Sequence, residues 1–169
     1  MPTRGARPAV LLAALTVVLL LVVGVLVWQR SGPGPSGAEL AREPAVAAPM
    51  AAVALGREHL DPRHGLFGAR DQHGLARFAY EVDLAPDAAI RAWVDAYGAR
   101  YGLRTADFDG RPIATGFVDD IAVVVLAGDD VSVPEGGPDA RARGFAPPAA
   151  GGTVVTVEVV HLGALDDLG

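Results

Sequence analysis

The sequence contains no cysteine, no lysine and no asparagine, so all fourteen of its basic residues are arginine. Without cysteine the chain has no disulfide, no thiolate metal site and no thiol nucleophile. Without lysine it has no Schiff base and no phosphate-binding P-loop lysine. These absences exclude several large classes of enzyme before any motif is considered.

Serine is scarce as well. The chain has only Ser31, Ser36 and Ser132, and none lies in the Gly-x-Ser-x-Gly turn of a serine hydrolase. We therefore expect a protein that is not an enzyme and that needs no cofactor. A carboxylate-dependent hydrolase is the catalytic alternative, because the chain has twenty Asp and Glu residues. The same acids also serve as a solvated surface that maintains solubility.

The longest apolar run covers residues 9–28 and contains no charge and no proline. A helix of this length spans about 30 Å, the thickness of the hydrocarbon core of a bilayer. Arg4 and Arg7 precede the run, which favours a cytoplasmic location for residues 1–8. The pattern predicts a retained single-pass membrane helix with the rest of the chain outside the cytoplasm. The alternative is a signal peptide that is cleaved near residues 36–38, which would release the remainder as a secreted protein.

Beyond the apolar run the chain is acidic. Residues 31–169 carry eleven arginines and all twenty acids, a net charge of −9, which argues against nucleic acid as a partner. Residues 29–56 are rich in Gly, Pro and Ala, a composition typical of a flexible linker. We therefore predict a linker over 29–56 and one extracytoplasmic domain over 57–169.

Strand patterns lie on both sides of one helix pattern. Residues 75–83 alternate, with Phe78, Tyr80 and Val82 on one face and Arg77 on the other. Pro86 is favoured at the first position of a helix, and Gly102 suits the left-handed residue that ends one. Between them runs an apolar stripe at helical spacing, formed by Ile90, Trp93, Val94, Tyr97 and Tyr101.

The second half of the domain predicts further strands. Asp109-Gly110 separates two short extended segments and is typical of a two-residue hairpin turn. Residues 121–127 and 153–162 are apolar strand patterns, whereas residues 128–152 have no periodicity and predict a mobile loop. The fold class is therefore α+β, a two-layer domain with one amphipathic helix on a mostly antiparallel sheet of about four or five strands, with its ordered core at about 75–162.

Two groups of residues are candidate sites. His59, His64 and His73 lie close to Asp61 in the sequence, and histidine and carboxylate are metal ligands. Their spacing does not place them on one helix face, so a solvated loop leading into the domain is the competing interpretation. Phe145, with Arg141 and Arg143 nearby, is the candidate for contact with a partner, and a disordered loop is the alternative there.

These observations lead to one expectation of function and two alternatives. A span, a linker and a small domain without a catalytic set predict a single-pass, membrane-anchored protein with a non-catalytic binding or accessory domain. The composition, rich in Ala, Gly, Val and Arg, fits a GC-rich bacterial genome, so we expect the partner to be another protein of the bacterial cell envelope. The alternatives are a small-ligand or metal-binding domain and the carboxylate-dependent hydrolase.

Overall fold

The computed structural model describes residues 20–21, 23–25, 34–64, 72–132, 139–149 and 151–162. Its strands are β1 (Val53–Leu60), β2 (Leu75–Val82), β3 (Arg104–Phe108), β4 (Arg111–Val118), β5 (Ile121–Gly128) and β6 (Thr153–His161). Its helices in the domain are α2 (Gly37–Leu40), the 3-10 turn η1 (Pro44–Val46) and α3 (Pro86–Tyr101).

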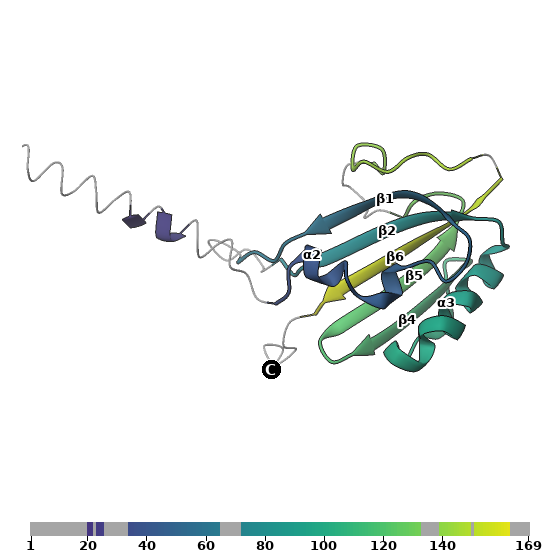
Figure 1. Cartoon of the computed structure of the whole chain (residues 1–169), viewed down its shortest axis with the longest axis horizontal. Helices are drawn as coiled ribbons and strands as arrows, with labels where there is room; N and C mark the ends of the chain where they lie inside the picture. Colours follow the sequence, from purple (N-terminus) through teal and green to yellow (C-terminus); the bar gives the residue numbers. More distant parts are fainter. Residues whose placement is uncertain are drawn as a thin grey trace, which may run out of the picture.

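The strands form one antiparallel sheet in the order β1-β2-β6-β5-β4-β3, and α3 packs across one of its faces (Figure 1). The last strand, β6, lies between β2 and β5, so it joins a part built from β1 and β2 to a part built from β3, β4 and β5. The predicted α+β class, with one helix on an antiparallel sheet, is confirmed.

The helix forms where the sequence places it. Pro86 occupies the first turn with Asp87, and Gly102 ends the helix in the left-handed conformation at φ 63°. Ile90, Trp93 and Tyr101 are buried against the sheet, as the apolar stripe predicts. The main core lies between this helix and the sheet.

The predicted hairpin is also present. Asp109 and Gly110 have φ values of 52° and 74°, the positive values that a type I′ turn requires at both central positions. The turn places Phe108 opposite Arg111 and sets the register of β3 against β4. Local turn chemistry therefore fixes the pairing at this end of the sheet.

The sheet has six strands rather than four or five, because β1 lies where the sequence predicted the end of a linker and the start of a loop. The pairing of β1 with β2 shifts register between Ala54 and Gly56. A bulge of this kind interrupts the two-residue alternation by which a strand is recognised in a sequence. The strand signal of β1 is hidden for that reason.

Residues 36–47 belong to the folded domain, which differs from the flexible linker predicted over 29–56. Leu40, Ala45 and Val46 are buried in the main core. Four aromatic side chains of β2 and α3 hydrogen-bond to this segment: the Tyr80 hydroxyl donates to the Val46 carbonyl at 2.6 Å, the Trp93 indole to Ala45 at 3.1 Å, the Tyr97 hydroxyl to Ala47 at 2.9 Å, and the Tyr101 hydroxyl to the Glu43 carboxylate at 2.7 Å.

The predicted membrane span, residues 9–28, lies outside the described residues except for 20–21 and 23–25. Within the described part of the chain, no helix combines the length and the apolar character needed to cross a bilayer.

Candidate partner-binding surface

The sheet presents one face to α3 and the other to the opposite side of the domain. Because side chains alternate along each strand, the register assigns Arg77, Glu158 and Val124 to the face away from α3, on three adjacent strands. The segment 139–149 covers one end of this face through a second apolar cluster of Leu55, Ala79, Val131, Phe145 and Val154. We call the rest of it the open face.

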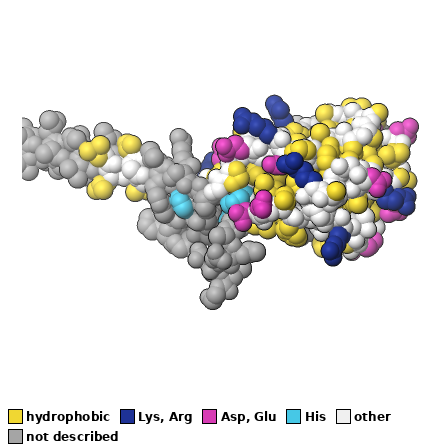
Figure 2. Space-filling view, turned by 60° about the horizontal axis from the view of Figure 1, so that its bottom comes forward, with side chains coloured by type: hydrophobic (Ala, Val, Ile, Leu, Met, Phe, Trp, Pro, Cys, Tyr) yellow, Lys and Arg dark blue, Asp and Glu magenta, His cyan; other side chains and the backbone are white. Residues whose placement is uncertain are grey.

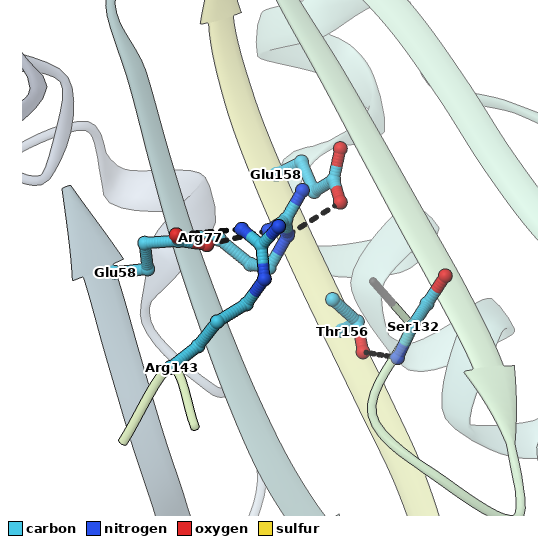
Figure 3. A network of polar contacts seen from close by, with 6 residues as sticks. All are labelled: Glu58, Arg77, Ser132, Arg143, Thr156 and Glu158. Atoms are coloured by element: carbon cyan, nitrogen blue, oxygen red, sulfur yellow. Dashed lines mark hydrogen bonds and ion pairs between the residues drawn. The ribbon is translucent and has the colours of Figure 1, made fainter. Parts of the chain in front are cut away.

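Arg77 is the centre of a charge network at the boundary of the covered area (Figure 3). It is only 2% exposed, and its guanidinium pairs with Glu58 on β1 and, at 2.7 Å, with Glu158 on β6. Arg143 of the covering segment pairs with the second oxygen of Glu58 at 2.7 Å. Two cations thus meet two carboxylates, so the network is neutral as a whole.

This network fixes both the sheet and the segment that covers it. A buried cation without partners would cost several kcal/mol, and two charge-assisted hydrogen bonds offset that desolvation. Arg143 joins the segment to Glu58 from the side, while the Ala146 N–H donates to the Leu55 carbonyl at 2.7 Å. The segment 139–149 is therefore attached to β1 by both a side chain and its backbone.

A cleft of 370 Å³ opens on the open face beside this network. Arg77, Glu158 and Ser132 form its polar end, and four apolar side chains line the rest: Phe108, Ile113, Val124 and Leu126. Phe108 is 65% exposed although it is aromatic. An apolar cleft with a few fixed polar groups at one end is the usual form of a binding site.

A second, more polar cleft of 290 Å³ lies on the other side of β3, between that strand and α3. Ile90 and Pro112 contribute apolar surface there, and Asp87, Arg91 and Asp107 contribute charge. The Asp107 carboxylate also accepts a hydrogen bond from the Gly110 N–H at 2.9 Å, which holds it at the turn. Strand β3 therefore has a cleft on each of its faces.

The residues predicted as candidate metal ligands each have different neighbours. His59 lies on β1 with its ring 5.8 Å from that of Phe78, and the Asp61 carboxylate accepts from the Gly37 N–H at 3.1 Å. His64 follows the isolated bridge between Arg63 and Gln72. The ring of His73 lies 6.2 Å from that of His161, and its buried Nδ1 has no hydrogen-bond partner.

Among the described residues, no three His, Asp or Glu side chains gather in a group that would hold a metal ion. Figure 2 shows histidine side chains at one end of the domain, with arginine and acidic side chains dispersed over the rest of the visible surface. The structure therefore does not bring His59, His64, His73 and Asp61 together into a site.

Phe145, the predicted partner contact, is 3% exposed and packs in the second apolar cluster. A Cβ atom at Gly56 would touch its ring, which shows how closely β1 approaches it. In this conformation the ring holds the segment 139–149 on the sheet and is not available to a partner.

Two tyrosines of the main core have perturbed acidities. Burial raises the pKa of Tyr80 above its ordinary value of 10.0, and the nearby Tyr97 adds to this. Burial also raises the pKa of Tyr101, and its hydrogen bond to Glu43 raises it further. Both groups belong to the main core and line neither cleft, so their acidities reflect the packing of the core.

The sequence did not indicate the importance of Arg77 and Phe108. Arg77 alternates with apolar residues and was assigned to the polar face of its strand, but the covering segment buries it. Phe108 stands next to a turn, where a lone aromatic residue has no periodic signal. The strand order was the missing information in both cases. It places Arg77 between Glu58 and Glu158, and it makes β3, which carries Phe108, the edge of the sheet.

Comparison of the chain with protein-family models, with curated proteins and with solved structures gave no match.

Proposed function

We propose that this chain is a single-pass, membrane-anchored protein whose extracytoplasmic domain binds another protein of the bacterial cell envelope and catalyses no reaction. The observation that carries the proposal is the apolar cleft on the open face, with Phe108 at its border. Exposed aromatic side chains beside an apolar depression are typical of the centre of protein interfaces.

The proposed absence of catalysis rests on the residues available. The chain lacks lysine and cysteine, and its three serines lie outside any nucleophile motif. In the cleft on the open face, Arg77 and Glu158 bind each other. Because the two charges neutralise each other, neither side chain is available as a catalytic acid or base. The cleft is then a neutral, mostly apolar surface suited to association.

The position of α2 supports retention of the N-terminal apolar run. The Ser36 side chain caps α2, and Gly37 is buried against the backbone of β1 and β2. Cleavage near residues 36–38 would cut inside this packed helix. A retained span that ends at residue 28 leaves six residue steps to residue 34, about 20 Å at full extension. The proposed domain therefore lies close to the bilayer rather than on a long stalk.

The experiment is crosslinking in native membranes, followed by purification on a C-terminal tag and mass spectrometry. We expect one partner protein near stoichiometry with the wild-type chain, and its loss when residues 34–169 are deleted. Phe108→Ala should lower its recovery about tenfold or more, the scale of an interface aromatic residue. Val53→Ala is the control, because Val53 is 64% exposed but lies on β1, at the opposite edge of the sheet, and does not line the cleft.

Loss of the partner in both Phe108→Ala and Val53→Ala would indicate a general effect of surface hydrophobicity and would contradict the role of the cleft. Recovery of the chain without a partner would contradict the proposed function.

A second candidate function is binding of a small ligand, because 370 Å³ lies within the range of small-molecule sites, about 300–1,000 Å³. A thermal-shift screen of the full chain in detergent separates the two. A small apolar compound that raises Tm in the wild type but not in a Leu126→Asp variant would favour the ligand.

A further inference from the structure

We infer that the partner binds by adding an extended segment to the free edge of β3, so that it becomes a seventh strand of the sheet. This inference rests on the proposed function and names how the same surface is used. The sheet order ends at β3, and all five residues of that strand are exposed. An exposed edge with unpaired backbone groups is a template for strand addition.

The two edges of the sheet differ in a way that points to β3. At the opposite edge, β1 has a bulge at Ala54 and Gly56, and its Leu55 carbonyl accepts a hydrogen bond from the Ala146 N–H. Bulges and covering segments are how natural sheets close their edges. Strand β3 pairs with β4 in continuous register. Among the described residues, its outer edge has neither a bulge nor a covering segment.

The turn determines which backbone groups of β3 point outward. In a two-residue turn the flanking residues, Phe108 and Arg111, exchange hydrogen bonds across the hairpin. Hydrogen-bonded and non-hydrogen-bonded pairs alternate along an antiparallel ladder. Thr105 and Asp107 therefore direct both their N–H and their C=O groups away from β4, toward an added strand.

The clefts on the two sides of β3 determine the chemistry of that strand. Side chains of an added strand alternate between the faces of the sheet. Those beside Ala106 and Phe108 point to the open face and the apolar cleft of 370 Å³. Those beside Thr105 and Asp107 point to the cleft of 290 Å³, where Asp87 and Asp107 outnumber Arg91.

The partner segment is thus an extended stretch in which apolar residues alternate with basic ones. The charge of the domain agrees with this assignment, because residues 31–169 carry a net charge of −9. Pairing of two carboxylates with arginine or lysine side chains of the partner adds selectivity against acidic segments.

The test compares Thr105→Pro with Thr105→Ala in the full chain. Proline removes the outward N–H of residue 105 and puts its ring in the path of an added strand, but breaks no hydrogen bond to β4. Alanine retains the N–H and is the matched control. In the native-membrane crosslinking experiment we expect recovery of the partner to fall about tenfold or more for Thr105→Pro, and to stay within about twofold of wild type for Thr105→Ala.

Hydrogen exchange on the purified complex gives a second measurement that does not depend on the folding of the proline variant. We expect the amides of Thr105 and Asp107 to exchange at least about tenfold more slowly in the complex than in the free protein, because each becomes a ladder donor. The amide of Ala106 already bonds to β4 and serves as the internal reference.

A separate variant tests the proposed basic character of the partner segment. Asp87→Asn should lower recovery about threefold, the scale of one exposed charge pair, and more at low salt than at high salt. Unchanged recovery with this variant would overturn the basic character of the segment and leave strand addition in place.

The outcomes distinguish the two proposals. A partner recovered equally with Thr105→Pro, with the Thr105 and Asp107 amides unprotected, would overturn strand addition while the binding function stands. Absence of any partner from the wild-type chain would overturn both.

Discussion

The indole N–H of Trp93, in the middle of α3, donates a hydrogen bond to the carbonyl of Ala45 at 3.1 Å. This bond joins the only long helix of the described domain to a segment that, from its composition, is typical of a linker. Both residues are fully buried. The folded unit therefore begins before β1, and the proposed distance between the domain and the membrane is set by a few residues.

Leu40→Ala tests whether residues 36–47 are part of the fold. Leu40 is 1% exposed in the main core, so the substitution should lower the free energy of unfolding by about 2–5 kcal/mol. Urea unfolding of a soluble fragment, residues 34–169, measures the change. Leu84→Ala is the control, because Leu84 is 39% exposed and should change stability by about 0.5 kcal/mol or less. Equal effects of the two variants would return the segment to a flexible linker.

Arg77→Leu tests the charge network. It leaves Glu158 without its cation and Glu58 with only Arg143, so we expect a loss of about 3–5 kcal/mol in the free energy of unfolding. Addition of Glu58→Gln and Glu158→Gln to this variant should restore part of the stability, since the unpaired charges are removed. A loss below about 1 kcal/mol is what a surface ion pair gives and would contradict burial of the network.

Stability should fall at alkaline pH because of Tyr80 and Tyr101. Both have a folded pKa raised above the ordinary value of 10.0, so the folded state keeps protons that the unfolded state releases. Their contribution is fully present below pH 10.0 and is lost as the pH rises through the folded pKa. Urea unfolding from about pH 8 to about pH 11 should show a shallower decline in Tyr101→Phe than in wild type. An unchanged decline in both Tyr101→Phe and Tyr80→Phe would contradict this assignment.

Gly116→Ala tests how closely α3 approaches the sheet. A Cβ atom at this position of β4 would overlap the backbone of Tyr101 and Gly102, where the helix ends. We expect the free energy of unfolding to fall by about 1–3 kcal/mol or more, because backbone atoms cannot move aside as a flexible side chain does. Gly128→Ala is the matched control: its Cβ would have no atom nearer than 4.0 Å. Thermal unfolding that shows the same Tm for both variants would contradict the close packing.

The elements that the sequence predicted are those with local signals. Strand β2 alternates, α3 has a proline at its start and a left-handed glycine after its end, and the β3–β4 hairpin has Asp-Gly at its turn. Strand β1 lacked such a signal, because the bulge at Ala54 and Gly56 breaks its alternation. Its absence from the prediction also left His59 in a loop, which made a metal site with His64 and His73 more plausible than the structure supports.

The surface now proposed as the site was not predictable in the same way. Phe108 and Ile113 are close in sequence, but Leu126 and Glu158 reach the same cleft only through pairings across β5 and β6. The burial of Phe145 likewise depends on contact with Leu55 of β1 and Ala79 of β2, which lie far from it along the chain. Such contacts depend on strand order, for which a single sequence carries no periodic signal.

The sequence by itself determined the chemistry that is closed to this protein, the α+β class and most of its regular elements, because residue types, turns and periodicity act over a few neighbouring positions. Only the tertiary structure decided where the domain begins, that Arg77 is buried, and that β3 is an open edge between two clefts. The insertion of β6 between β2 and β5 places Glu158 beside Arg77 and joins β1 and β2 to the other three strands in one sheet, through pairings between residues that lie far apart in the sequence.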